Sequence, residues 1–297
     1  MDIRVLQYFL AVAREESITK AAETLRMTQP PLSRQLKDLE EELGKQLLIR
    51  GSKKVTLTED GMLLRKRAEE LVDLMEKTKA ELSSSNESIN GDIYIGCGET
   101  EGISFLAQTA HNLQKKHPLI HYHIYSGDAE RVMERLDKGL IDFGLVFGTA
   151  DTSKYDYLTF PVKDSFGILM RKDSPLADRD FITPGDLIDK PLIFNRNITD
   201  GDPILRWLKK DLSEIHTAAT YNLLFNASLM VAEGLGYAFA LDKIINVTGD
   251  SGLLFKPLSP ALHAEMNLIW KKYQFFSRPA RKFLEKITLL AQQRPVL

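Results

Sequence analysis

The sequence has a single cysteine, Cys97, among its 297 residues. One cysteine cannot form an intramolecular disulfide or a multi-cysteine zinc site, so the sequence excludes both. No apolar run reaches the roughly 20 residues that a membrane-spanning helix needs. The first residues, MDIRVLQYFLAVAREE, carry charges within their apolar pattern, unlike the core of a signal peptide. We therefore expect a soluble, cytoplasmic protein with no membrane partner.

Signatures of catalysis are also missing. No GxSxG motif, P-loop or His–carboxylate pair occurs in a context that supports chemistry. His117, His121 and His123 lie close together, but their positions beside a proline and on one polar strand face favour a solvated surface over a metal site. Cys97 has no second cysteine to resolve an oxidised form, which favours a packed thiol over an oxidant sensor. We expect no enzyme activity, no cofactor and no metal.

The first 45 residues have the apolar spacing of three short helices. Val5, Leu6 and Phe9 recur at helical intervals, and Ser17 is a suitable N-cap for a second helix. The stretch MTQPPLSRQLKDL contains two prolines, which a first helical turn tolerates because its N–H groups have no partner within the helix. A third helix therefore starts there, and its expected buried stripe consists of Leu32, Leu36, Leu39 and Leu43.

The opposite face of this third helix is polar and cationic. Gln29, Ser33, Arg34 and Lys37 stand where a recognition helix would reach bases and phosphates in a major groove. The next stretch, LLIRGSKKVTLT, reads as a basic hairpin, which suits contacts with the DNA backbone. Residues 1–58 hold ten Lys and Arg against eight Asp and Glu, although the whole chain has a net charge of -2. The combination predicts a winged helix-turn-helix; a solvated helical bundle is the alternative.

FLAVAREESITKAAETLRMTQPPLSRQLKDLEEELGKQLLIR, followed by VTLTEDG, resembles the signature of the bacterial LysR-type transcriptional regulators, and the likeness extends over essentially the whole chain. The resemblance implies promoter DNA as a partner, with RNA polymerase a further candidate. The wing sequence GSKK carries less arginine than that of many members. The residues implied to contact DNA are Thr28, Gln29, Pro30, Ser33, Arg34, Lys37, Arg50, Lys53 and Lys54.

A long helix is expected over residues 59–84, with Glu59 and Asp60 in its first turn. Its apolar positions step by four and three residues, as in a coiled coil, so we expect it to pair with a second copy. Packing against the chain's own domains is the alternative. The resemblance implies a homodimer assembled into a homotetramer. The predicted dimerisation residues are Leu64, Ala68, Leu71, Met75 and Leu82.

A polar hinge is expected at residues 85–91, followed by an α/β domain over residues 92–297. Strands and helices alternate in two sets, which predicts parallel sheets in two lobes. Lobe I should contain about 92–163 and 266–297, and lobe II about 164–265. This architecture resembles that of periplasmic solute-binding proteins, as the effector domains of the LysR family do.

The cleft between the lobes should bind a small-molecule effector, because ligands of open α/β sheets lie beyond the carboxyl ends of the strands. The residues predicted there by position or by resemblance are Gly98, Glu99, Thr100, Asp128, Phe147, Asn195, Arg196, Asn197 and Thr199. Hydroxyls, amides and Arg196 favour a carboxylate-bearing metabolite, whereas Glu99 and Asp128 suit an amine. The overall prediction is a DNA-binding regulator controlled by this effector; a solute-binding protein and an enzyme that uses the cleft are the alternatives.

Overall fold

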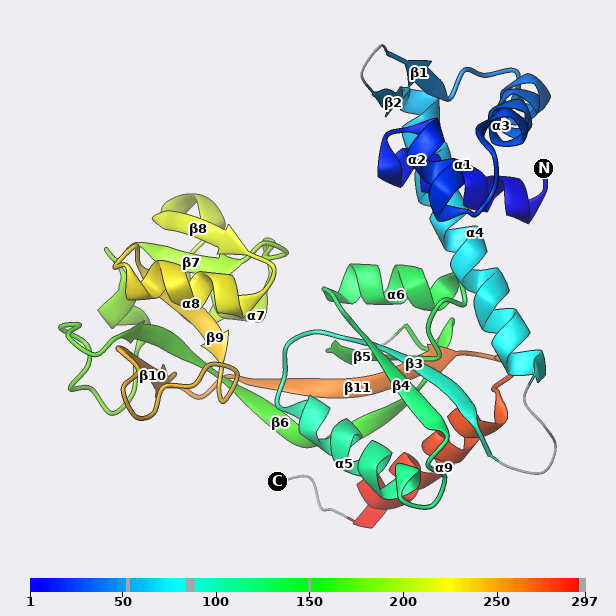
Figure 1. Ribbon diagram of the computed structural model, residues 1–297. Coiled ribbons are helices and arrows are strands. Elements are labelled where there is room, and N and C mark those ends of the chain that lie inside the picture. The colour runs from blue at the N-terminus through cyan, green and yellow to red at the C-terminus, as the bar shows by residue number, and fades with distance from the viewer. Residues whose placement is uncertain (52–53, 84–88, 149–150, 294–297) are drawn as a thin grey trace. The chain divides into compact units, whose positions relative to one another are not determined.

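The computed structural model describes residues 1–51, 54–83, 89–148 and 151–293 (Figure 1). The chain divides into two compact units, Met1–Ser83 and Ser84–Leu297. Within the described ranges, no helix has the length and apolar character needed to cross a membrane.

The first unit contains three short helices, a hairpin and a long helix. The helices are α1 (Ile3–Glu15), α2 (Ile18–Thr24) and α3 (Gln29–Leu43); the hairpin strands are β1 (Leu48–Arg50) and β2 (Val55–Leu57); and the long helix is α4 (Glu59–Ser83). Ser17 caps α2 by accepting from the Lys20 amide. Thr28 occupies the N-cap position of α3 but makes no side-chain capping bond, so the prolines of the first turn pre-set the start of this helix.

The core of the first unit lies between α1, α2, α3 and the hairpin. Phe9, Leu32 and Leu36 are at most 1% exposed. The prediction of a buried stripe was wrong at its last position, because Leu43 is 39% exposed. Leu43 is the final residue of α3, and the chain turns away at Gly44, whose φ of 63° is the left-handed conformation that glycine adopts without strain. The helix ends before Leu43 can reach the core.

The start of α4 is fixed to the segment before the hairpin. The Thr58 hydroxyl donates to the Gln46 carbonyl at 2.7 Å and accepts from the Gly61 amide at 3.0 Å. A Cβ atom at Gly61 would overlap the Leu47 carbonyl oxygen. Glycine therefore permits the close approach of α4 to the base of the hairpin.

The first turns of α4 also pack within their own unit. Leu64 contacts the core cluster and Ala68 has no exposed surface, while α1 packs along α4. Leu71 and Leu82, farther along, are 42% and 82% exposed. The alternative of internal packing thus holds for the two predicted dimerisation residues nearest the hairpin.

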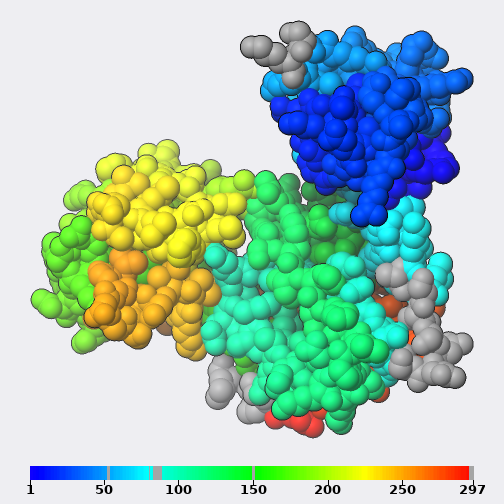
Figure 2. Space-filling view, viewed as in Figure 1, coloured from blue at the N-terminus to red at the C-terminus, as the bar shows by residue number. Residues whose placement is uncertain are grey.

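The second unit has two α/β lobes; in Figures 1 and 2, coloured by residue number, lobe I is mostly teal and green with its last helix in red, and lobe II is mostly yellow-green to orange. Lobe I consists of β3 (Gly91–Cys97), α5 (Gly102–Gln114), β4 (Ile120–Ser126), α6 (Ala129–Asp137), β5 (Phe143–Phe147) and α9 (Arg278–Gln293). Lobe II consists of β7 (Leu192–Asn195), α7 (Pro203–Leu208), β8 (Thr217–Tyr221), α8 (Leu224–Ala232), β9 (Tyr237–Leu241) and β10 (Leu253–Pro257), with short 3₁₀ turns at Pro184–Leu187 and Leu212–Glu214. Two long strands, β6 (Tyr155–Arg171) and β11 (His263–Lys271), connect the lobes.

The strand order is β4-β3-β5-β11-β6-β9-β7-β8, with β10 beside β6. Pairs of β3 with β4 and β5, and of β7 with β8 and β9, are parallel as predicted. All pairs that involve β6 or β11 are antiparallel, so the prediction of purely parallel sheets was wrong there. The chain leaves lobe I along β6 and returns along β11, and two adjacent strands that cross in opposite senses must be antiparallel.

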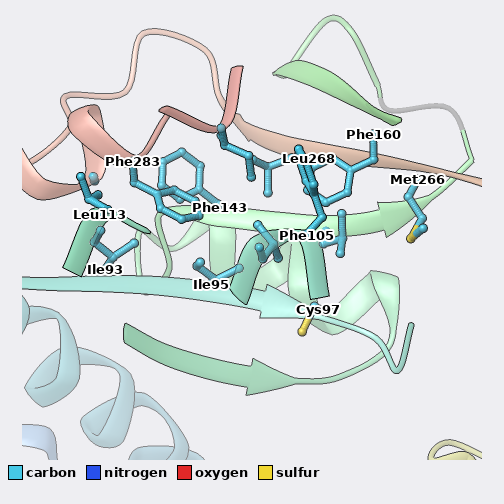
Figure 3. Packing of buried hydrophobic residues seen from close by; sticks show 14 of the residues in the cluster. Ile93, Ile95, Cys97, Phe105, Leu113, Phe143, Phe160, Met266, Leu268 and Phe283 are labelled. Atoms are coloured by element: carbon cyan, nitrogen blue, oxygen red, sulfur yellow. The ribbon is translucent and has the colours of Figure 1, made fainter. Parts of the chain in front are cut away.

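Helices cover both faces of the sheet in each lobe. In lobe I, α5 and α9 bury one face, where Phe143 and Phe283 pack with ring centroids 5.6 Å apart (Figure 3). Val132 and Leu136 of α6 bury the other face. In lobe II, α7 and α8 contribute to separate clusters. Each lobe therefore has its own core, and the loops at the strand ends are left to form the surface between the lobes.

Candidate functional site

The predicted recognition surface lies on α3. Thr28, Gln29, Pro30, Arg34 and Lys37 are exposed and Ser33 is half-buried, whereas Leu32, Leu36 and Leu39 of the same helix face the core. Lys37 pairs with Glu41 one turn along, at 3.1 Å. In the described part of the chain Arg34 has no ion-pair partner, so its guanidinium is available to a base edge or a phosphate.

The hairpin is joined to α3 and α1 by basic side chains. Arg50 donates to the Ser33 hydroxyl at 3.2 Å, and Lys54 pairs with Glu16 at 3.1 Å. Lys53, also predicted to contact DNA, lies outside the described residues. The Arg50 contact brings the wing beside the polar face of α3, so the two predicted DNA-contacting segments form one surface.

A cavity of about 500 Å³ lies between the two lobes. Its walls come from the carboxyl ends of β3 and β5, the start of α6, the loop after β7, and parts of β8, β9 and β11. Six of the predicted effector residues line it: Gly98, Glu99, Asp128, Phe147, Asn195 and Asn197. The rule that ligand sites follow the carboxyl ends of strands located the cavity correctly.

Three predicted effector residues do not line the cavity. Thr100 is 4% exposed; it donates to Asp164 at 2.6 Å and accepts from the Gly102 amide at 2.9 Å, so it serves the start of α5. Arg196 is directed to Asp128 instead of the cavity, and Thr199 is exposed in the loop before α7. Position after a strand and resemblance indicated these residues, but neither could show which way each side chain faces.

Polar contacts connect the lobes across the cavity. Arg196 of lobe II donates to Asp128 of lobe I at 2.9 Å, and the Glu99 carboxylate of lobe I accepts from the Leu224 amide at the start of α8. Burial by itself would raise the pKa of Asp128, but hydrogen bonds from the Arg131 amide, Asn197 and Arg196 outweigh it and lower that pKa. Asp128 is therefore a carboxylate at neutral pH.

Sequence reasoning missed several polar residues of the cavity, namely Asp202, Tyr221, His263 and Glu265. Asp202 stands before Pro203, and this Asp-Pro pair is a recognisable helix start. His263 and Glu265 belong to β11; the sequence predicted that the chain returns to lobe I near residue 266, but not that the start of this strand lines the cavity. The Ser165 hydroxyl lies 3.1 Å from the His263 ring.

His123 and Cys97 make structural contacts within lobe I. His123 stacks on Tyr94, with ring centroids 4.6 Å apart, and lies 2.9 Å from Asp92. Cys97 is 3% exposed in the lobe I core, and burial raises the pKa of its thiol to about 11 (Figure 3). A thiol so protonated and buried is a poor nucleophile.

Together, the fold and these surfaces define a class of protein: a winged helix-turn-helix unit followed by a two-lobed ligand-binding unit. Residues 3–62 match the model of the bacterial regulatory helix-turn-helix protein of the lysR family, and residues 86–290 match the LysR substrate binding domain. The chain belongs to the LysR family of DNA-binding transcriptional regulators, as the sequence had indicated.

Relatives with similar sequences are regulators from Bacillus subtilis (strain 168). The HTH-type regulator YvbU is 28% identical over 292 residues, which cover 96% of this chain and 97% of that protein. The regulator CysL is 34% identical over 183 residues, covering 62% of this chain and 61% of that protein. The structure of full-length CbnR complexed with its target DNA has the same fold, with a TM-score of 0.75 and 16% identity over 99% of this chain and 100% of that one.

Proposed function

We propose that this regulator binds its promoter site through α3 and the wing, and that a small molecule in the cleft between lobes I and II controls the binding. One observation carries the effector proposal: a 500 Å³ cavity between two lobes that are held by contacts from opposite walls. A molecule that binds there touches both lobes and favours one arrangement of them. The regulator would act in the bacterial cytoplasm, the compartment that holds promoter DNA.

The proposed control is a shift between arrangements of the protein. An effector can move such an equilibrium only by binding one arrangement more tightly than the other. Arg196–Asp128 and Glu99–Leu224 are contacts that open or close with the lobes, so an effector that strengthens or replaces them changes the relative energies of the arrangements. In an oligomer, this change would alter the spacing of the winged units on DNA, and through it the access of RNA polymerase to the promoter.

The proposed assembly is a homodimer formed through α4, and pairs of dimers form a homotetramer. Leu71 and Leu82 of α4 are apolar and exposed in the single chain, as expected of a helix that pairs with a second copy. Two winged units per dimer can read two half-sites about one turn of DNA apart. Leu64 and Ala68 already pack within the first unit of the same chain, so the proposed dimer contact involves residues of α4 that follow Ala68.

At the DNA, Arg34 is the proposed base-reading residue, supported by Gln29 and Ser33 of the same face. Arg50, Lys53 and Lys54 of the wing and Lys37 are proposed to contact phosphates. Thr28 and Pro30 place the first turn of α3 against the backbone, where helix N–H groups favour phosphate.

A binding assay on a defined promoter fragment tests this proposal. Arg34→Ala should weaken specific binding by roughly tenfold or more, because a good arginine–base contact contributes about 1–3 kcal/mol. Arg4→Ala is the matched control, since Arg4 is an exposed arginine at the start of α1. Lys54→Ala should instead reduce the salt dependence by about one unit of log–log slope. Equal affinities of the Arg34 variant and the parent would contradict the assignment of α3.

A further inference from the structure

At the start of each helix around the cleft, a side-chain oxygen of the chain itself accepts a hydrogen bond from a backbone amide. In lobe I, Asp128 accepts from the Arg131 amide of α6 at 3.0 Å, while Thr100, backed by the buried Asp164, accepts from the first amide of α5. In lobe II, Asp202 accepts from the Ile204 amide of α7 at 2.8 Å. Glu99 reaches from lobe I to the Leu224 amide of α8.

These contacts weaken the usual attraction of such a cleft for anions. Free N–H groups at helix starts, together with the helix dipole, are what make strand-to-helix loops bind phosphates and carboxylates. Here a side-chain oxygen occupies each start. The Glu99 contact is the most telling, because its partner lies 125 residues away in the other lobe.

The charge of the cavity wall points the same way. Four carboxylates line it, Glu99, Asp128, Asp202 and Glu265, and no lysine or arginine of the described chain does. Arg196 pairs with Asp128, and Lys163 lies 3.6 Å from Glu265. No cationic side chain that the structure describes comes within 4 Å of Glu99 or Asp202. Among the described residues, Glu99 and Asp202 therefore have no cationic partner within this distance, and the cavity wall carries an excess of negative charge.

The rest of the wall is apolar. Phe147, Phe166 and Phe239 line the cavity with Ile198 and Ile204. Aromatic and aliphatic walls suit a ligand with a hydrocarbon or ring body, and they lower the local dielectric, so that a charge on the ligand is felt more strongly.

We propose that the effector is an organic cation, an amine or guanidine with an apolar body, and that Glu99 is the residue that selects it. This inference rests on the proposed effector function of the cleft, and it replaces the carboxylate-bearing metabolite favoured by the sequence. The cation's N–H groups bind the free lone pairs of Glu99 while its body lies on the aromatic wall. An anion would have to displace Glu99 from α8 and then lie among carboxylates, where like charges repel it.

Three probes of one size and different charge test this on the full chain: benzylammonium, benzyl alcohol and benzoate, at equal ionic strength. A ligand that binds only the folded state raises Tm as its concentration rises. We expect benzylammonium to raise the Tm of the second unit more than benzyl alcohol does, and benzoate to raise it least. Benzoate equal to or better than benzylammonium, or no effect of benzylammonium, overturns the proposal.

Glu99→Gln keeps the size and an acceptor for the Leu224 amide but removes the charge, so the fold should be retained. Its apparent affinity for benzylammonium should be about tenfold lower, as expected for the loss of one charge-assisted hydrogen bond. Glu285→Gln, an exposed carboxylate of α9 that does not line the cavity, is the matched control and should bind as the parent does. An unchanged affinity of the Glu99 variant would remove Glu99 from the selecting role.

The two levels of the proposal fail separately. If benzoate binds the cleft and alters the promoter footprint, effector control stands and the cationic class falls. If benzylammonium binds with the expected dependence on Glu99 but promoter binding is the same with and without it, the ligand class stands and its role as effector falls.

Discussion

Arg196 of lobe II donates a hydrogen bond of 2.9 Å to Asp128 of lobe I, across the cavity that separates the two lobes. The carboxylate is 6% exposed and the guanidinium 41% exposed, so this is a half-solvated ion pair. It joins the start of α6 to the loop after β7, so a separation of the lobes at this point would break it.

Arg196→Met should lower the free energy of unfolding of the second unit only slightly, by about 0.5–1 kcal/mol, because the guanidinium is partly solvated. Urea unfolding followed by circular dichroism measures this. A double-mutant cycle with Asp128→Asn gives the coupling between the partners. A coupling of zero would show that the pair contributes nothing to the hold between the lobes.

The same pair gives a pH dependence whose sign is defined. Because the pKa of Asp128 is lowered in the folded protein, its contribution is complete above the ordinary carboxyl pKa of about 4 and is lost as pH falls through the lower folded-state value. The stability difference between the parent and Arg196→Met should therefore shrink at acid pH. Unfolding at pH 7 and at the lowest pH where the chain stays folded tests this; a constant difference would assign it to packing.

Gly61→Ala should destabilise the first unit, because the added methyl overlaps the Leu47 carbonyl at the base of the hairpin. Overpacking of this kind typically costs about 1–3 kcal/mol. Met62→Ala, at an exposed neighbouring position, is the control and should stay within about 0.5 kcal/mol of the parent. Thermal unfolding compares the parent and the two variants. Equal melting temperatures would mean that the base of the hairpin moves to accommodate the methyl group at no cost in stability.

Leu71→Ser should weaken self-association if α4 pairs through its heptad seam. Leu71 is exposed in the single chain, so its replacement should not disturb a core within the monomer. Sedimentation velocity over a range of concentrations measures the change. Leu74→Ser is the comparison, because Leu74 is similarly exposed, at 38%, but stands off the predicted seam. Loss of association in the Leu74 variant alone would place the contact on another face.

Cys97 should react slowly with iodoacetamide in the folded protein. At pH 7.5, a thiol with a pKa of about 11 has fewer than roughly one thiolate in a thousand, and this one is also buried. Mass spectrometry should show rapid labelling in urea and little without it. Fast labelling of the folded chain would indicate frequent opening of lobe I around β3.

Local patterns accounted for the secondary structure where neighbours in sequence are neighbours in space. Ser17 and Pro30 indicated where α2 and α3 begin. The alternation of strands and helices predicted a cleft at the carboxyl ends of β3, β5 and β7. The direction of β6 and β11, and with it the placement of His263 and Glu265 in the cleft, depends on how the chain crosses between lobes, which spacing does not encode.

By itself, the sequence determined that this chain has a winged helix-turn-helix, a long amphipathic helix and two α/β lobes, because caps, prolines and apolar periods act over a few residues. Only the tertiary structure decided which charged side chains face the cavity between the lobes. Asn195, Asn197 and Arg196 look receptive to an anion in sequence, but folding turns Arg196 to Asp128 and brings Glu99 to α8. Electrostatics at a site depends on distances through space between residues such as Glu99 and Leu224, which are far apart along the chain.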